Sequence, residues 1–247
     1  MTRLFRERID SVRAEKKSRL VLAVDPPASV PDVMDFAEKT ISLVQEHVCA
    51  IKVNFHLILP LSGAELAKLN NLAHAYGLQC IADIKLNDIE NTNDVALDHL
   101  VGRMGFDCVI ANPSIGASAL ENLVKKSRQT GGGVIALVYM SHPGAGEGFG
   151  LKLEGNREIY GVFLERASNA DVDGVVVGAS KLEIIKAAAR GRIPVYSPGV
   201  GIQGGDAERA AKSGADYLIV GRSIIESRDP AAAAKELKTR ISSAVSD

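Results

Sequence analysis

The sequence has few cysteines and no long apolar segment. Its three cysteines, Cys49, Cys80 and Cys108, show no CxxC spacing, and an odd number does not suit a disulfide framework. They lie in or beside apolar, strand-like runs, so we expect buried thiols in a reducing compartment. No run approaches the ~18 apolar residues of a membrane span, and charged residues replace the apolar core of a signal peptide at positions 1–10. These absences predict a soluble cytoplasmic protein.

The sequence also lacks an excess of either charge. Lysine and arginine total 29 against 30 aspartates and glutamates, a net charge of -1, so the basic surface of a nucleic-acid binder is not expected. His47, His56, His74 and His99 show no metal-ligand spacing and are interpreted as packing or surface residues. The partner is therefore predicted to be a small molecule.

What the sequence does contain is a repeated alternation of strand-like and helix-like segments. Eight apolar runs are each followed by a helical pattern, and 247 residues suit a (β/α)8 barrel of ~250 residues. We predict one such domain over residues 1–247, with a short amphipathic helix at 2–17 closing its bottom. An open doubly wound sheet is the alternative, but no GxGxxG follows the first strand. The predicted strands lie at 20–24, 49–54, within 80–89, and at 107–112, 134–140, 174–178, 193–197 and 217–220.

Charged side chains recur where the first three of these strands end. Asp25 follows the first strand, and Lys52 lies near the end of the second. Asp83 and Lys85 end the third, and because they are two residues apart they are predicted to share a face. Sites of such barrels are built at the C-terminal strand ends, so these side chains and Ser141, after the fifth strand, are predicted to meet at one mouth.

The last two strands are followed by groups typical of phosphate binding. A glycine-rich turn at 198–205 contains Gln203, and Gly221, Arg222 and Ser223 follow the eighth strand. Backbone N–H groups and a guanidinium fork bind phosphate at this position of many barrels. A phosphorylated small substrate is therefore predicted.

Lys85 lies between two acidic residues, Asp83 and Asp88. Flanking carboxylates favour the ammonium form, which suits a proton donor and argues against the Schiff-base lysine of a class I aldolase. Asp83 also suits a substrate whose own anionic group must leave, since two unit charges ~4 Å apart repel by about 4 kcal/mol at an effective dielectric of ~20. The structural alternative is an ion pair that caps a buried strand.

The stretch Asp83-x-Lys85-x-x-Asp88-Ile89, with Thr92, resembles the signature of the orotidine 5'-monophosphate decarboxylase family. The compact length is most similar to the microbial, particularly archaeal, branch. Further blocks resemble that family in the same order along nearly the whole chain, at 23–25, 51–54, 140–144, 197–206 and 219–223.

The resemblance implies a role for each matched residue. Lys85 is expected to protonate carbon 6 of the pyrimidine as carbon dioxide leaves, and Asp83 to crowd the substrate carboxylate. Lys52 would hold Asp83 and a ribose hydroxyl, Asp25 would contact the ribose, and Ser141 would hydrogen-bond the pyrimidine. The other substrate-binding residues that the resemblance implies, chiefly around the phosphate, are Pro198, Val200, Gly201, Gln203, Gly221 and Arg222.

The resemblance further implies a homodimer, in which Asp88, Ile89 and Thr92 reach into the neighbouring subunit's site. Asp88 would then complete a catalytic set with Lys52, Asp83 and Lys85. The resemblance also implies that neither a metal nor an organic cofactor is needed.

Two other functions remain open from the sequence. One is a magnesium-dependent sugar-phosphate decarboxylase or aldolase of the same suprafamily, which EDTA would inactivate. The other is a phosphate-binding barrel without catalysis, which would leave the near-ultraviolet absorbance of orotidine monophosphate unchanged.

Overall fold

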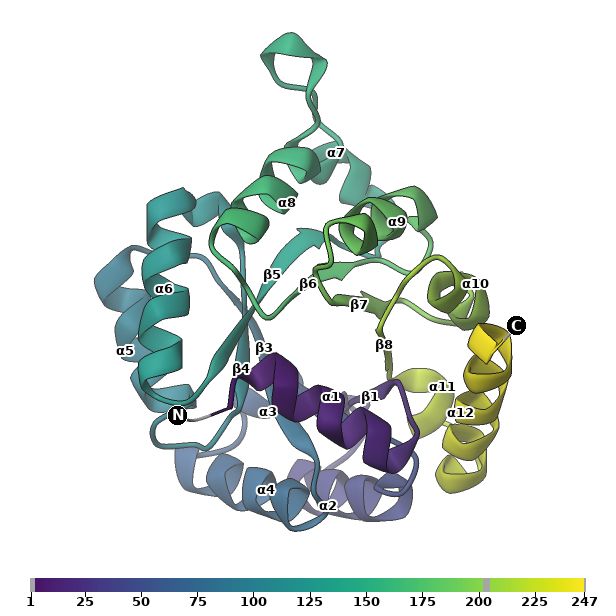
Figure 1. The fold of residues 1–247 in the computed structure, drawn as a ribbon. Coiled ribbons are helices and arrows are strands. Elements are labelled where there is room, and N and C mark those ends of the chain that lie inside the picture. The colour runs from purple at the N-terminus through teal and green to yellow at the C-terminus, as the bar shows by residue number, and fades with distance from the viewer. Residues whose placement is uncertain (1–2, 202–204, 247) are drawn as a thin grey trace.

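A computed structural model describes residues 3–201 and 205–246 of the chain. Eight parallel strands close into a barrel in sequence order, β1 pairing with both β2 and β8, and helices surround it (Figure 1). The predicted (β/α)8 architecture is confirmed. The strands are β1 (Leu20–Ala23), β2 (Ala50–Val53), β3 (Gln79–Leu86), β4 (Cys108–Ala111), β5 (Gly133–Tyr139), β6 (Gly174–Val177), β7 (Val195–Pro198) and β8 (Tyr217–Val220).

Helices connect the strands on the outside of the barrel. The α-helices are α1 (Phe5–Lys16), α2 (Val33–Val44), α3 (Phe55–Ile58), α4 (Gly63–Ala75), α5 (Glu90–Leu100), α6 (Ala117–Gln129), α7 (Gly146–Phe149), α8 (Ile159–Asn169), α9 (Leu182–Arg190), α10 (Ala207–Lys212), α11 (Arg222–Ile225) and α12 (Pro230–Ser246). The 3-10 helices η1 (Pro113–Ile115), η2 (Pro143–Ala145) and η3 (Glu154–Asn156) lie in the connections after β4 and β5.

Strands such as β1 and β4 are apolar along their whole length because both of their faces are buried. In β1, Leu20 and Leu22 belong to the outer core between strands and helices, whereas Val21 and Ala23 belong to an inner core. This alternation leaves only the strand ends free for polar side chains.

The α1 helix closes the bottom of the barrel, at the end opposite to the carboxyl ends of the strands. Phe5 and Ile9 are fully buried against the inner core, and Figure 1 shows α1 lying across this opening. Arg6 pairs with Asp171 at 2.6 Å between Nη1 and Oδ1, which ties the helix to the barrel. The closing helix predicted at residues 2–17 is thus present over Phe5–Lys16.

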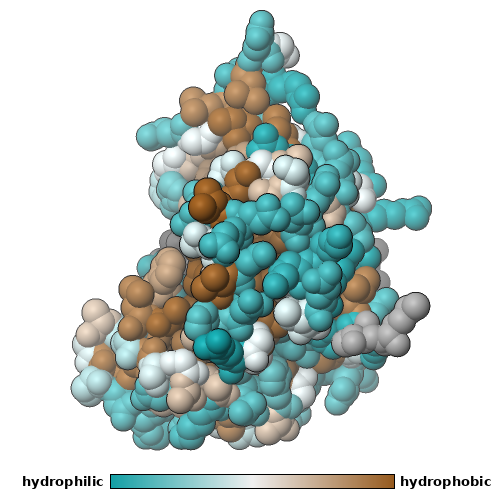
Figure 2. Space-filling model, turned by 90° about the vertical axis from the view of Figure 1, so that its left-hand side faces the viewer, coloured by the Kyte–Doolittle hydropathy of each residue, from teal (hydrophilic) through white to brown (hydrophobic). Residues whose placement is uncertain are grey.

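The connection between β5 and β6 projects from the barrel, at the top of Figure 1. It contains η2, α7, η3 and a bridge between Lys152 and Glu158, and it exposes Leu151 and Leu153. Figure 2 shows apolar surface in separate areas of the face that it presents, divided by hydrophilic surface. No helix within residues 3–201 and 205–246 is long and apolar enough to cross a membrane.

Candidate active site

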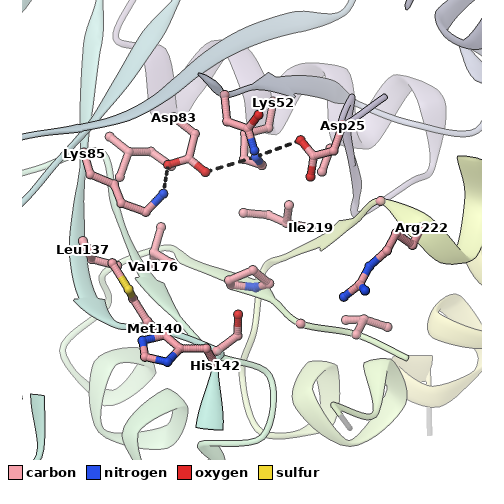
Figure 3. Close-up of a pocket in the computed structure, with 18 residues that line it drawn as sticks. Asp25, Lys52, Asp83, Lys85, Leu137, Met140, His142, Val176, Ile219 and Arg222 are labelled. Carbon is pink, nitrogen blue, oxygen red and sulfur yellow. Dashed lines mark hydrogen bonds and ion pairs between the residues drawn. The ribbon is translucent and has the colours of Figure 1, made fainter. Parts of the chain in front are cut away.

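A chain of four charged side chains lies at the carboxyl ends of β1, β2 and β3 (Figure 3). Lys52 Nζ is 3.7 Å from Asp25 Oδ1 and 3.0 Å from Asp83 Oδ2. The other oxygen of Asp83, Oδ1, accepts a hydrogen bond of 2.7 Å from Lys85 Nζ. The order is therefore acid, base, acid, base, and each Asp83 oxygen has its own ammonium partner.

This environment keeps Asp83 ionised. Burial alone would raise its pKa, because only 11% of its side chain is exposed. The charges of Lys52 and Lys85, and their hydrogen bonds to the carboxylate, outweigh burial and leave the pKa of Asp83 below its ordinary value. A stable negative charge is thus held beside the Lys85 ammonium.

The backbone of β3 is irregular at Lys85. Its φ angle is 49°, in the left-handed region, and the pairing of β3 with β4 shifts register between Ala82 and Leu86. A left-handed conformation costs a residue with a Cβ about 1–2 kcal/mol. Packing of the surrounding strands offsets this strain, which is common where a side chain is aimed into a site.

The charged chain forms one wall of a cavity of about 330 Å³ at the barrel mouth. Arg222 projects into the same cavity from the far side in Figure 3, and Ser141 and His142 also line it. A ligand filling this space would have cations at both ends and an apolar surface between them. The apolar lining comes from Ile110, Leu137, Met140, Val176 and Ile219.

The side of the cavity next to Arg222 is built from close backbone approaches. Pro198, Gly199 and Val200 line it from the end of β7, and Gly221 lines it at the end of β8. A Cβ on Gly221 would lie 3.3 Å from both Cβ and O of Ala23, so even alanine would require a small shift of its neighbour there. Backbone and guanidinium groups can therefore approach an anion together.

Gly201 continues this loop but does not line the cavity. Its φ angle is 80°, and its N–H donates to the carbonyl oxygen of Gly205 at 2.8 Å. A Cβ at this position would come within 2.6 Å of Ser223 Oγ, so glycine permits both the conformation and the close approach. Gln203, which the sequence predicts to contact the phosphate, lies outside the described residues.

Three predicted site residues do not reach the cavity of their own chain. Asp88 and Thr92 are exposed, and Ile89 is 71% exposed. Asp88 Oδ1 accepts a hydrogen bond of 2.7 Å from the backbone N–H of Ile89. The fourth member of the predicted catalytic set is therefore separate from Lys52, Asp83 and Lys85 within one chain.

The predicted site residues did not include the apolar wall or two polar lining residues, Asn54 and His142. Asn54 Oδ1 caps α3 by accepting from the N–H of His56 at 2.9 Å. The apolar lining residues are hard to separate from ordinary core in the sequence. Their only signal is that they occupy inward positions near the ends of β4, β5, β6 and β8.

Comparison with known proteins decides the family. The sequence profile described as "Orotidine 5'-phosphate decarboxylase / HUMPS family" matches residues 18–237, which include every residue that lines the cavity. The chain belongs to this family. The resemblance predicted from the Asp83 to Thr92 stretch is thus confirmed.

Archaeal members of the family are similar over most of the chain. The orotidine 5'-phosphate decarboxylase of Thermococcus kodakarensis is 36% identical over 232 residues, covering 92% of this chain and 98% of the relative. That of Pyrococcus abyssi is 35% identical over 210 residues, 84% of this chain and 93% of the relative.

A solved structure of the family has the same fold. The orotidine 5'-monophosphate decarboxylase of Methanocaldococcus jannaschii, complexed with the inhibitor BMP, superimposes with a TM-score of 0.78 at 30% identity. The superposition covers 91% of this chain and 98% of that structure.

Proposed function

We propose that the protein decarboxylates orotidine 5'-monophosphate to uridine 5'-monophosphate and carbon dioxide, the last step of pyrimidine nucleotide synthesis. Family membership supports this reaction, as do the relatives named for it. The observation that carries the proposal is the Lys85 ammonium, which lines the cavity while bound to an ionised Asp83 at 2.7 Å. A proton donor and a fixed negative charge then stand side by side where a substrate would lie.

In the proposed reaction the bond between carbon 6 and the carboxylate breaks, and its electron pair stays on carbon 6. Lys85 gives this carbon a proton, and solvent later returns one to the neutral amine. Asp83 repels the substrate carboxylate, but a repulsion of about 4 kcal/mol at ~4 Å and an effective dielectric of ~20 is too small alone. The larger part comes from stabilising the developing carbanion beside the ammonium and from binding energy at the phosphate.

The remaining cavity residues bind the substrate. Asp25 and Lys52 hold ribose hydroxyls, and Ser141 hydrogen-bonds the pyrimidine. Arg222 lies across the cavity from the charged chain, an arrangement that suits a substrate with phosphate at one end and its reacting carbon at the other. The phosphate group is assigned to Pro198, Val200, Gly201, Gln203, Gly221 and Arg222.

We propose a homodimer in which Asp88, Ile89 and Thr92 enter the partner's site. Their exposure in one chain supports this, because an isoleucine that is 71% exposed gains stability from being covered. Phe55 and Leu59, which follow β2 at the same end of the barrel, are exposed large apolar residues as well. A cytoplasmic location is proposed from the three buried, free thiols.

The reaction is proposed to need no metal, since a lysine replaces a Lewis acid beside the carbanion. Wild-type protein assayed after EDTA treatment is expected to keep its rate of absorbance loss with orotidine monophosphate. Inactivation by EDTA with recovery by magnesium would instead favour the sugar-phosphate enzyme of the same suprafamily.

The decisive test is Lys85→Ala, compared with Lys186→Ala. Lys186 lies on α9 and pairs with Glu183 on the surface, so it controls for loss of a lysine elsewhere. Lys85→Ala is expected to lose nearly all turnover, and Lys186→Ala to lose none. Equal turnover in wild type and Lys85→Ala would remove Lys85 from the mechanism, and no turnover in wild type would favour a barrel without catalysis.

A further inference from the structure

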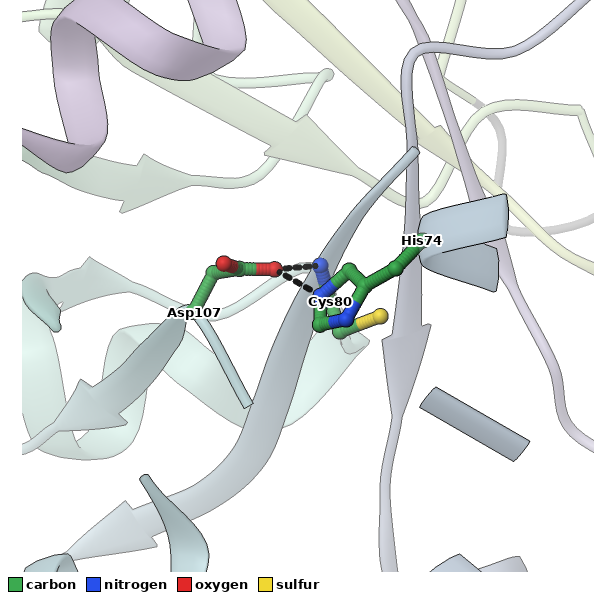
Figure 4. Close-up of side chains that lie close together, drawn as sticks. All are labelled: His74, Cys80 and Asp107. Atoms are coloured by element: carbon green, nitrogen blue, oxygen red, sulfur yellow. Dashed lines mark hydrogen bonds and ion pairs between the residues drawn. The ribbon is translucent and has the colours of Figure 1, made fainter. Parts of the chain in front are cut away.

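Three side chains with metal-binding atoms meet at the bottom of the barrel, away from the cavity (Figure 4). They come from three elements: His74 from α4, Cys80 from β3, and Asp107 from the residue before β4. One ring nitrogen of His74, Cys80 Sγ and one Asp107 oxygen all lie within 4.8 Å of one another. Among the described residues, this is the one group of three histidine, cysteine or acidic side chains found with such spacing.

The donor set suits a borderline-soft divalent cation. Imidazole nitrogen, thiolate sulfur and carboxylate oxygen are the ligands of Zn²⁺, which binds them at about 2.0–2.3 Å in a tetrahedron. Tetrahedral ligands at these bond lengths stand roughly 3.3–3.8 Å apart. His74 Nε2 and Asp107 Oδ2 are 2.8 Å apart and the three ligand atoms lie within 4.8 Å, so shifts of up to roughly 1 Å would bring all three to bonding distance of one ion.

The trio is held in place by hydrogen bonds that a bound ion would partly replace, among them one of 3.8 Å from Cys80 Sγ to the carbonyl oxygen of Asn70. Asp107 Oδ2 accepts 2.8 Å hydrogen bonds from His74 Nε2 and from the backbone N–H of Cys80. The other oxygen of Asp107, Oδ1, faces Arg8 Nη2 at 3.4 Å. Arg8 is itself fixed by Gln79, whose Oε1 accepts from Arg8 Nε at 3.1 Å. Such a second layer orients a ligating carboxylate.

The arrangement also provides access and charge balance. Cys80 is fully buried, but the His74 side chain is 36% exposed, which gives an ion a path from solvent and leaves a fourth position for water. Two positive charges on the ion would face one thiolate and one carboxylate, with Arg8 adjacent. Without an ion, the hydrogen bonds of Asp107 satisfy the group, so the fold does not require metal.

We propose that His74, Cys80 and Asp107 form a binding site for one zinc-class ion, separate from the active site. Binding replaces the thiol proton, which is released to solvent, by a sulfur–metal bond. The Nε2 proton of His74 moves to Nδ1, and Nε2 then donates its lone pair to the ion. The bound ion joins α4, β3 and the start of β4, and so it stabilises the end of the barrel that carries α1.

The test uses Co²⁺ as a probe on EDTA-stripped wild-type protein. A thiolate-to-cobalt band in the near ultraviolet is expected to grow to one equivalent of Co²⁺ and to disappear when Zn²⁺ is added. Cys80→Ser should abolish the band, while the matched control Cys108→Ser, on β4 and equally buried, should keep it. His74→Gln should weaken Zn²⁺ binding at least about tenfold, as loss of a metal-site contact does.

Zn²⁺ should also raise the Tm of wild type and of Cys108→Ser but not that of Cys80→Ser. Absence of the band in wild type, or equal Zn²⁺ affinity in wild type, Cys80→Ser and His74→Gln, would overturn the proposal. If Cys80→Ser does not fold, His74→Gln alone decides. Turnover plays no part in this test, because the site and the cavity lie at opposite ends of the barrel.

Discussion

Asp83 lies between two ammonium groups at the mouth of the barrel and forms an ion pair with each of them. Lys52, with 6% of its side chain exposed, has only Asp25 at 3.7 Å as another ion-pair partner in the described chain. Removing one member of a buried pair costs about 3–5 kcal/mol, since the other charge stays desolvated. We expect Asp83→Asn to lower the free energy of unfolding at neutral pH by about this much, measured by urea denaturation.

The pH dependence of that difference follows from the depressed pKa of Asp83. Its folded pKa lies below the ordinary value of 3.8, so the folded state binds the proton less readily than the unfolded state. The stabilisation is therefore complete above 3.8 and is lost as the pH falls through the folded pKa. The difference between wild type and Asp83→Asn should stay constant down to about pH 5 and shrink only at more acidic values. A difference that shrinks near neutrality would contradict this assignment.

The left-handed backbone of Lys85 allows the side chain and the main chain to be tested separately. Lys85→Ala and Lys85→Gly both remove the ammonium, but only glycine adopts a φ of 49° without strain. Glycine also gains entropy in the unfolded state, so Lys85→Gly should be more stable than Lys85→Ala by only about 0.5–1 kcal/mol. Urea denaturation of the two inactive variants measures this, and greater stability of Lys85→Ala would show that the backbone is unstrained.

At the residue level, the sequence predicts those site members that are charged and stand where an apolar run ends. Asp25, Lys52, Asp83 and Lys85 carry that signal, and the structure brings them together. The acids at the other end of the barrel lack this signal. Asp107, Asp171 and Asp173 precede strands, where the sequence indicates only turn residues. Their partners, such as Arg6 for Asp171, come from distant positions, and such pairings depend on the closed barrel.

Among the elements, the contact between α1 and β5 gives a clear packing prediction. A Cβ on Gly133 would lie 2.5 Å from Phe5 Cβ and 3.0 Å from Asp173 Oδ2. Gly133→Ala therefore has to displace α1 or the start of β5, and such overpacking costs about 1–3 kcal/mol. Thermal denaturation should show the loss.

The control is Gly161→Ala on α8, where a Cβ meets nothing within 4 Å. Alanine is a better helix former than glycine by about 0.8–1.0 kcal/mol, so this variant should be as stable as wild type or more stable. Equal stability of Gly133→Ala and Gly161→Ala would show that α1 does not press on the barrel floor.

The sequence predicts elements that repeat over several residues, and it misses those made by a single turn. The eight strands follow from uniform apolar runs, and long helices such as α4 follow from their periodicity. Four-residue helices such as α3 and α11 have too few positions to show a period. The register shift in β3 was also not predicted, because it arises from pairing with β4.

For the whole molecule, the proposed homodimer predicts that two inactive variants restore each other. Lys85→Ala leaves Asp88 intact for its partner, and Asp88→Asn leaves Lys85 intact in its own site. Mixing the two after subunit exchange should produce activity that neither has alone, because each hybrid dimer contains one complete site. Sedimentation of the single variants controls for loss of the dimer.

An inactive mixture of two dimeric variants would place Asp88 outside the partner's site. Ile89→Glu is the matching test of association, since it puts a charge into the surface proposed to be covered. It should shift the protein toward monomer at micromolar concentration.

Because α1 closes one end of the barrel with the fully buried Phe5 and Ile9, the cavity formed by the described residues opens toward the carboxyl ends of the strands. In the proposed reaction, carbon dioxide released beside Lys85 therefore leaves on the side where the nucleotide entered. Product release is then sequential. Carbon dioxide leaves either past the nucleotide that is still bound or after that nucleotide has dissociated.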